Sequence, residues 1–142
     1  MKQLIAAISL ITASMLLYAC PKYEVDYITF VNKSEKWIVC QPFSIPRHFI
    51  NTDTLFRCGI GAIGILPDSL YKFSSLNHSG WETDFRAISH MQFLVMDTET
   101  YSKYIAEPCD TIRKYVPILH RYQLTLEDLQ RMNWTVVYPP EK

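Results

Sequence analysis

The sequence predicts an α+β fold, a single compact domain built on a mostly antiparallel β-sheet with several short helices. Segments rich in β-branched and aromatic residues, which favour strands, lie near both ends of the chain, at 25–32 and 134–138. Between them, stretches with apolar residues at helical spacing are short and are interrupted by prolines. We expect one globular domain over residues 25–142, after an N-terminal segment of different character.

The first two strands are expected at 25–32, VDYITFVN, and at 36–40, KWIVC. The polar stretch NKSE between them predicts a hairpin loop, which would pair the two strands with each other. Pro42 and Pro46 are expected to prevent further pairing. Residues 47–58 indicate an irregular stretch followed by a short strand.

The middle of the chain contains a strong strand pattern. Residues 91–96, MQFLVM, form a run between polar residues that is apolar except for Gln92, which predicts a central strand buried on both faces. Residues 66–76 predict a half-buried strand that follows a turn at Pro67-Asp68. Residues 81–88 predict a short helix, because their large apolar residues have helical spacing: Trp81, Phe85 and Ile88.

The C-terminal third predicts further short elements. Residues 97–108 and 111–116 indicate helices that prolines end, whereas 118–124 fits either a helix or a strand. Thr125 with Asp128 three residues later is a variant of the capping box. It predicts the start of a helix with three apolar residues on one side: Leu126, Leu129 and Met132.

The N-terminal segment has the pattern of a cleaved signal. Lys2 precedes an apolar run from Leu4 to Tyr18, about 15 residues, which suits a signal peptide better than the roughly 20 residues of a membrane-spanning helix. The run ends in Leu17-Tyr18-Ala19-Cys20, which resembles the lipobox of bacterial lipoproteins, although Tyr18 replaces the usual small or β-branched residue. The resemblance implies that residues 1–19 are removed and that Cys20 is acylated, leaving 20–24 as a lipidated N-terminus and short tether.

A multiply acylated cysteine would hold the chain firmly at a membrane. Pro21 follows Cys20, so the aspartate that retains lipoproteins in the inner membrane of enteric bacteria is absent. We therefore expect a lipid anchor in the outer membrane of the cell envelope, with the domain on the periplasmic face or on the cell surface. An ordinary secretory signal with a chance cysteine is the alternative.

The other cysteines, Cys40, Cys58 and Cys109, would then lie in an oxidising compartment. One disulfide and one free thiol is the simplest arrangement, and Cys58 with Cys109 is the pairing that we prefer. Three buried reduced thiols are the alternative. No cysteine or histidine has metal-ligand spacing, so no metal site is expected; the histidines are His48, His78, His90 and His120.

Several other patterns lack the context that their chemistry needs. Residues 59–64, GIGAIG, match the dinucleotide fingerprint, but Pro67 follows too soon for the required helix, so we expect an apolar strand or loop and no nucleotide. Basic and acidic residues number 14 each, which argues against nucleic acid as a partner. Ser, Cys, His and acidic residues occur without a nucleophile elbow, so we expect no catalytic residues and no cofactor.

Three short acidic–hydroxyl–aliphatic sequences resemble the acceptor sites of protein O-glycosylation in the Bacteroidetes. They place candidate modification sites at Thr54, Ser69 and Thr111. The alternative is that Asp with Ser or Thr caps turns and helices there.

The tail ILHRYQLTLEDLQRMNWTVVYPP, with the order of elements before it, resembles small Bacteroidetes lipoproteins of unknown function. The resemblance implies a location and an architecture and, besides Cys20, no functional residue. We expect a non-enzymatic binding or accessory module with a protein or glycan partner, which it contacts through exposed tyrosines and an irregular loop at 41–65. The alternatives are an immunity-type lipoprotein that neutralises a toxin by binding and an unrecognised hydrolase. Trp37, Phe93 and Trp134 are expected in the core.

Overall fold

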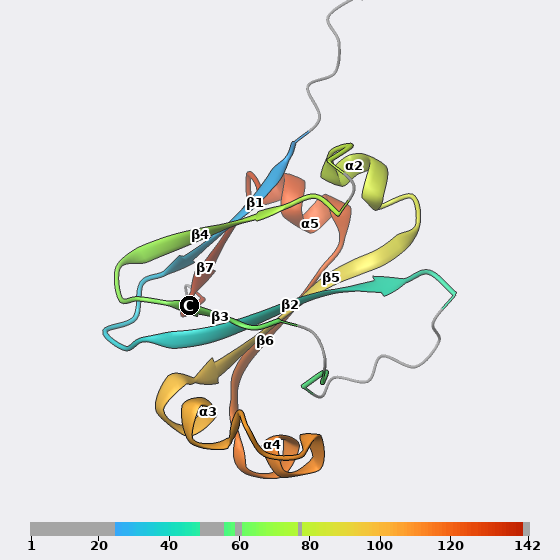
Figure 1. The fold of residues 1–142 in the computed structure, drawn as a ribbon. Coiled ribbons are helices and arrows are strands. Elements are labelled where there is room, and N and C mark those ends of the chain that lie inside the picture. Colours follow the sequence, from blue (N-terminus) through green and yellow to red (C-terminus); the bar gives the residue numbers. More distant parts are fainter. Residues whose placement is uncertain (1–24, 49–55, 59–60, 77, 141–142) are drawn as a thin grey trace, which may run out of the picture.

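The computed structural model describes residues 25–48, 56–58, 61–76 and 78–140. Its strands form two sheets that face each other across the core (Figure 1), one with the strand order β4-β1-β7 and the other with the order β3-β2-β5-β6. All but one of the strand pairings within these ranges are antiparallel. The predicted α+β architecture with a mostly antiparallel sheet is confirmed.

The smaller sheet contains β1 (Tyr27–Asn32), β4 (Ser69–Ser74) and β7 (Thr135–Tyr138). Its central strand β1 runs antiparallel to β4 and parallel to β7, so the first and last strands of the domain lie side by side. The strands predicted at 25–32, 66–76 and 134–138 are therefore present.

The larger sheet contains β2 (Ile38–Pro46), β3 (Ile63–Ile65), β5 (Ile88–Asp97) and β6 (Ile118–Leu124). Every residue from position 91 to 96 is buried, and β5 lies between β2 and β6, as predicted for a central strand. The ambiguous segment 118–124 is the strand β6, because it pairs with β5 along most of its length.

The predicted hairpin between the first two strands is wrong, because β1 and β2 belong to different sheets. The polar residues between them carry the chain from one layer to the other, and β1 pairs instead with β4 and β7. The local pattern of strand, polar loop and strand is the same in a hairpin and in such a crossing. Only the distant partner strands distinguish the two.

Pro42 and Pro46 do not end the second strand, which is a second correction. Pro42 lies opposite Phe93 in the β2–β5 register. Because β3 pairs only with Ile38–Cys40, β2 beyond Cys40 has no strand partner on that side among the described residues, and proline is tolerated at such an edge. Of the irregular loop expected at 41–65, residues 41–46 belong to β2 and 63–65 to β3, whereas 49–55 and 59–60 lie outside the described residues.

The helices are short: α2 (Trp81–Asp84), α3 (Thr98–Tyr104), α4 (Cys109–Tyr115) and α5 (Leu126–Arg131). Helix α2 ends earlier than predicted, since Ile88 already belongs to β5. Helices α3 and α4 confirm the helices predicted at 97–108 and 111–116. The Thr125–Asp128 capping box is formed at the start of α5.

The main core fills the space between the two sheets. Phe30 of β1, Phe93 of β5 and Tyr122 of β6 pack there as an aromatic cluster. Trp81 of α2 and Leu129 of α5 are buried in the same core. Helices α3 and α4 cover part of the opposite face of the larger sheet, where they form a second apolar cluster with Val39, Phe56, Met96, Tyr101, Ile112 and Val116.

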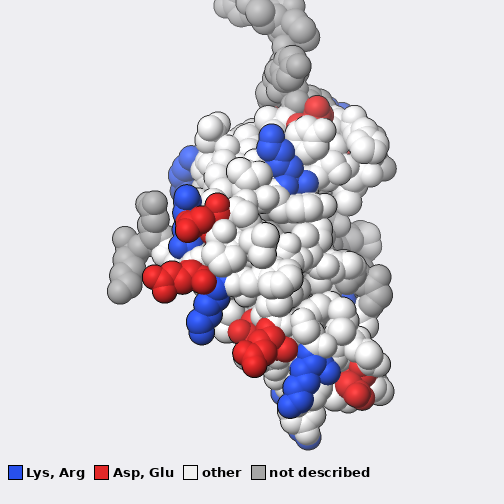
Figure 2. Space-filling view, turned by 60° about the vertical axis from the view of Figure 1, so that its left-hand side comes forward, with Lys and Arg blue, Asp and Glu red and all other residues white. Residues whose placement is uncertain are grey.

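The surface carries charges of both signs close together. Figure 2 shows Lys and Arg beside Asp and Glu on one face, with a broad uncharged area between the charged groups. Among the described helices, none combines the length and the apolar character that crossing a bilayer requires.

Candidate binding surface

Trp37 is the large aromatic residue whose placement departs most from the sequence prediction. Phe93 and Trp134 contribute to the core as expected, but the Trp37 side chain is 52% exposed. Its indole packs over Gly64 of β3, where a Cβ atom would lie only 2.8 Å from Nε1 and 3.3 Å from both Cε2 and Cζ2. Glycine at position 64 therefore leaves room for the Trp37 ring, which lies against β3 on one side and remains open to solvent elsewhere.

The buried side chain of Asn32 fixes the backbone on which Trp37 stands. Its Nδ2 lies 2.8 Å from the Lys36 carbonyl oxygen, 3.0 Å from that of Ile65 and 3.1 Å from that of Leu66. Its Oδ1 accepts hydrogen bonds from the Ser34 backbone N–H at 3.0 Å and from the Ser34 hydroxyl at 2.6 Å. One amide thus ties the β1–β2 crossing to the end of β3. The backbone directly before Trp37 is therefore held to β3.

A pocket of about 380 Å³ opens beside the ring, and we call its lining the Trp37 surface: Lys36, Trp37, Asp97, Thr98 and Glu99. Asp97 is the N-cap of α3, and its carboxylate accepts hydrogen bonds from the Thr100 N–H at 2.8 Å and from the Thr100 hydroxyl at 2.7 Å. These bonds, with a smaller contribution from the charge of Lys36, lower the pKa of Asp97. The lining therefore offers carboxylate acceptors and one lysine donor beside the exposed indole ring.

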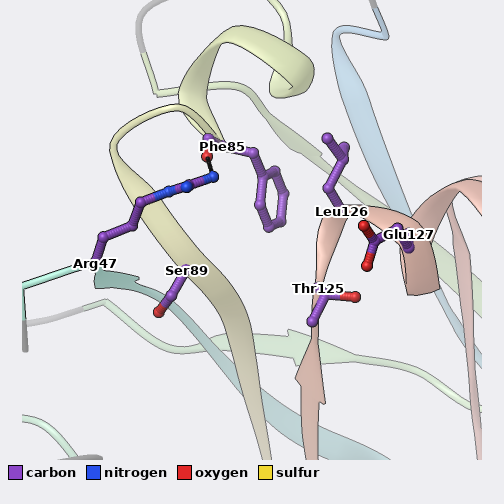
Figure 3. A pocket seen from close by; sticks show the side chains of 6 residues that line it. All are labelled: Arg47, Phe85, Ser89, Thr125, Leu126 and Glu127. Atoms are coloured by element: carbon purple, nitrogen blue, oxygen red, sulfur yellow. Dashed lines mark hydrogen bonds between the residues drawn. The ribbon is translucent and has the colours of Figure 1, made fainter. Parts of the chain in front are cut away.

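A second pocket, of about 330 Å³, lies between β2, the start of β5 and the start of α5 (Figure 3). The Arg47 guanidinium donates to the Phe85 carbonyl oxygen at 2.8 Å and to the Ile88 carbonyl oxygen at 3.2 Å. The Ser89 hydroxyl lies 3.0 Å from the Ile45 carbonyl oxygen, and the Thr125 hydroxyl belongs to the capping box. Arg47, Ser89 and Thr125 are bonded within the fold, and the aromatic ring that lines this pocket, that of Phe85, is buried. Without an exposed aromatic ring, this pocket is the weaker candidate for a ligand.

Ser89 also lies beside a histidine, which bears on the hydrolase alternative. Its hydroxyl oxygen is 2.9 Å from Nδ1 of His90. The other ring nitrogen, Nε2, is buried without a hydrogen-bond partner among the described residues, and burial lowers the pKa of His90. A catalytic serine needs a histidine that a third group orients. Within the described part of the chain, no such group binds the His90 ring.

The predicted disulfide partners, Cys58 and Cys109, are joined in the structure, with their Cα atoms 5.8 Å apart. The bond attaches residues 56–58 to the start of α4. Cys40 is a free, buried cysteine, and burial raises the pKa of its thiol. Within the described ranges, no three His, Cys, Asp or Glu side chains are placed to hold a metal ion.

The remaining predicted sites are scattered over the fold. Cys20 and Thr54 lie outside the described residues. The Ser69 hydroxyl donates to the Leu66 carbonyl oxygen at 2.7 Å in the turn before β4, and Thr111 lies in the first turn of α4. Gly64 lies in β3, which agrees with the expectation of a strand or loop for the glycine-rich motif.

Comparison with models of protein families, with curated proteins and with solved structures finds no match for this chain. The function is therefore inferred from the residues and their geometry.

Proposed function

We propose that this chain is a lipid-anchored protein of the cell envelope that acts by binding a partner, without catalysis, at the Trp37 surface. The observation that carries the proposal is the exposed Trp37 ring, supported by Gly64 and fixed through Asn32. A fold normally buries a tryptophan, and tryptophans that remain exposed on rigid supports are typical anchors of interfaces.

The rim of the surface indicates the kind of partner. Asp97 and Glu99 stand opposite a single cation, Lys36, so phosphate groups meet no concentrated positive charge. A protein or a glycan, each with apolar patches and hydrogen-bonding groups, fits an exposed indole ring beside polar side chains. Nucleic acids and nucleotides fit poorly.

Two features support a place in the envelope. The lipobox-like Leu17-Tyr18-Ala19-Cys20 supplies the anchor. The Cys58–Cys109 disulfide is the kind of bond that persists in oxidising compartments outside the cytoplasm.

The anchor is tested by growing cells with an alkyne-bearing palmitate analogue and isolating the protein. The wild-type chain should carry the label and should begin at Cys20, whereas Cys20→Ala should remain unlabelled and longer. An unlabelled wild-type chain would remove the anchor from the proposal.

The binding surface is tested by retaining partners from solubilised envelopes on the purified full chain. Trp37→Ala should reduce the captured partner by at least tenfold, since truncating an anchor residue typically costs about 2 kcal/mol or more. The matched control is Tyr115→Ala on α4, which removes an aromatic side chain of similar exposure, 48%, outside the Trp37 surface. Equal capture by Trp37→Ala and Tyr115→Ala would contradict the proposal.

A further inference from the structure

The chain enters the domain at a fixed point. The Val25 backbone N–H donates to the Glu82 carboxylate at 3.0 Å, and the Val25 carbonyl oxygen accepts from the Trp81 N–H at 2.9 Å. The Asp26 carbonyl oxygen accepts from the Ser75 N–H at 2.8 Å. Strand β1 therefore begins against α2 and the end of β4, at the top of Figure 1, whereas α3 and α4 lie at the bottom.

The distance between this entry point and the bilayer is limited. If Cys20 carries the lipid, as proposed above, only residues 21–24 separate the anchor from Val25. At about 3.5 Å per residue, even a fully extended tether reaches about 17 Å. The surface beside Val25 must then stay within that distance of the lipid headgroups.

That surface exposes side chains suited to a bilayer interface. Tyr27 is 50% exposed at the start of β1, and Leu76 is 57% exposed just beyond β4. The Leu76 backbone N–H donates to the Asp84 carboxylate at 2.7 Å, which keeps this segment against α2. Lys72 lies with its Nζ 5.9 Å from the centre of the Tyr27 ring. Aromatic, aliphatic and lysine side chains of this kind are those that insert at, or snorkel to, an interface.

We propose that Tyr27, Lys72 and Leu76 form a membrane-facing surface that contacts the lipid headgroups beside the anchor. The proposal rests on the lipid anchor of the proposed function. Lys72 is accompanied at this end of the domain by carboxylates, those of the exposed Asp26 and of Glu82, which accepts from Val25, so no excess of positive charge calls for an anionic lipid. Asn32 lies at the other end of β1, about 17 Å from Tyr27 at the usual rise of a strand. The Trp37 surface lies beside this far end, because the Asn32 side chain bonds the Lys36 carbonyl oxygen. The orientation therefore leaves the Trp37 surface open to the aqueous side.

The test uses the acylated full chain in vesicles of phosphatidylcholine with and without doxyl-labelled lipid. One variant, Leu76→Cys, carries an environment-sensitive fluorophore on the new thiol, and the control variant, Tyr115→Cys, carries it on α4. Background labelling is low, because Cys58 and Cys109 are joined, Cys40 is buried and Cys20 is acylated. For side chains within about 5–10 Å of the headgroup boundary, we expect at least threefold stronger quenching at position 76 than at 115, with a blue-shifted emission.

Equal quenching at the two positions of an acylated chain would overturn the membrane-facing surface and leave the anchor intact. A mass spectrum without the acyl chains would overturn the anchor itself, and this proposal with it. If the difference in quenching appeared only with anionic lipid, it would contradict a contact that needs none.

Discussion

Replacing Asn32 by alanine is the substitution that most directly tests how the Trp37 surface is held. The side chain is fully buried and joins two separate backbone segments, 34–36 and 65–66. Alanine fits the strand position but removes both N–H donors and the acceptor oxygen. The backbone groups that bond the Asn32 side chain, among them the carbonyl oxygens of Lys36 and Ile65, would lose that partner.

The expected loss follows from the number of bonds. Each neutral hydrogen bond contributes about 1 kcal/mol net, and a buried carbonyl left unpaired costs about 1–3 kcal/mol. The Ile65 carbonyl oxygen is the buried acceptor, whereas those of Lys36 and Leu66 can reach water more easily. We therefore expect Asn32→Ala to lower the free energy of unfolding by about 3 kcal/mol. A domain of ordinary stability, about 5–15 kcal/mol, would remain folded.

Urea unfolding followed by circular dichroism measures this loss, and an unchanged slope with denaturant would show that the unfolding reaction is the same. Ser34→Ala is the matched control, because it removes one hydroxyl, which bonds Asn32 Oδ1 and the Lys36 backbone, but leaves the Asn32 amide in place. It should cost less than Asn32→Ala, about 1 kcal/mol. A loss for Asn32→Ala no larger than that of Ser34→Ala would refute the role of the amide in joining the two segments.

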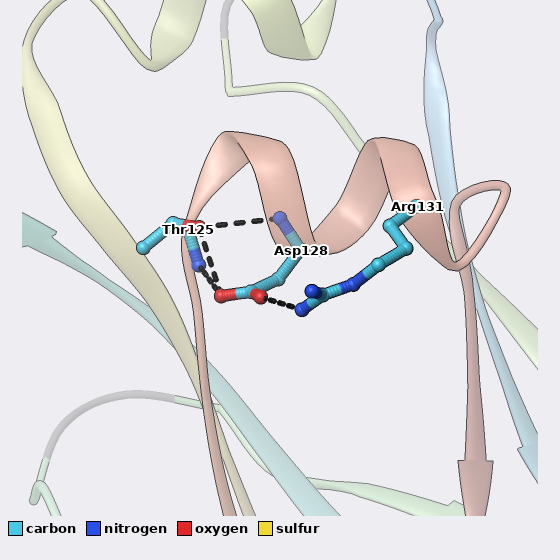
Figure 4. Close-up of polar contacts among 3 residues, drawn as sticks. All are labelled: Thr125, Asp128 and Arg131. Atoms are coloured by element: carbon cyan, nitrogen blue, oxygen red, sulfur yellow. Dashed lines mark hydrogen bonds and ion pairs between the residues drawn. The ribbon is translucent and has the colours of Figure 1, made fainter.

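Three further predictions concern other contacts. Gly64→Ala should destabilise the domain by about 1–2 kcal/mol by displacing the Trp37 ring, and it should be neutral or stabilising in a Trp37→Ala background. Replacing Cys58 and Cys109 by serine opens a loop with a sequence separation of 51 and should cost about 4 kcal/mol in thermal or urea unfolding. Hydrogen bonds from the Thr125 backbone N–H and hydroxyl lower the pKa of Asp128, with a smaller effect from the ion pair with Arg131 (Figure 4). The stabilisation that the ionised Asp128 carboxylate gives the fold is therefore complete above its unfolded-state pKa, near pH 4, and is lost as the pH falls through its lower folded-state pKa. Asp128→Asn should consequently weaken the dependence of the urea midpoint on acid pH.

Each of these predictions has a result that contradicts it. Additive effects of Gly64→Ala and Trp37→Ala would mean that the ring does not rest on the glycine. An unchanged unfolding midpoint without the disulfide would mean that the bond does not limit the unfolded chain. Parallel pH profiles for Asp128→Asn and wild type would mean that the carboxylate is not held ionised by the cap.

The elements that sequence reasoning identified are those whose signals are local. Apart from Gln92, the run at 91–96 is apolar on both faces, because β5 has a sheet neighbour on each side and apolar clusters on both faces. Thr125 and Asp128 carry the complete capping signal within four positions, and both reciprocal bonds of the box are present in the structure (Figure 4). Such signals need no knowledge of distant residues.

The errors concern contacts between distant parts of the chain. Pairing of β1 with β4 and β7 depends on residues about 40 to 100 positions away along the chain. The polar loop after β1 carries no information on these partners, and by itself it predicts a hairpin. The exposure of Trp37 depends on Gly64 and Asn32, which approach it only in the folded chain. The position of Trp37 directly after the polar stretch NKSEK is the one local sign that its ring could face solvent.

The most direct test of the proposed function is photo-crosslinking in intact cells from a photoreactive amino acid placed at position 37, compared with the same amino acid at position 115. Binding at the Trp37 surface predicts a specific crosslinked partner from position 37 that is absent from position 115. The same products from both positions, or none from position 37, would contradict recognition through this surface.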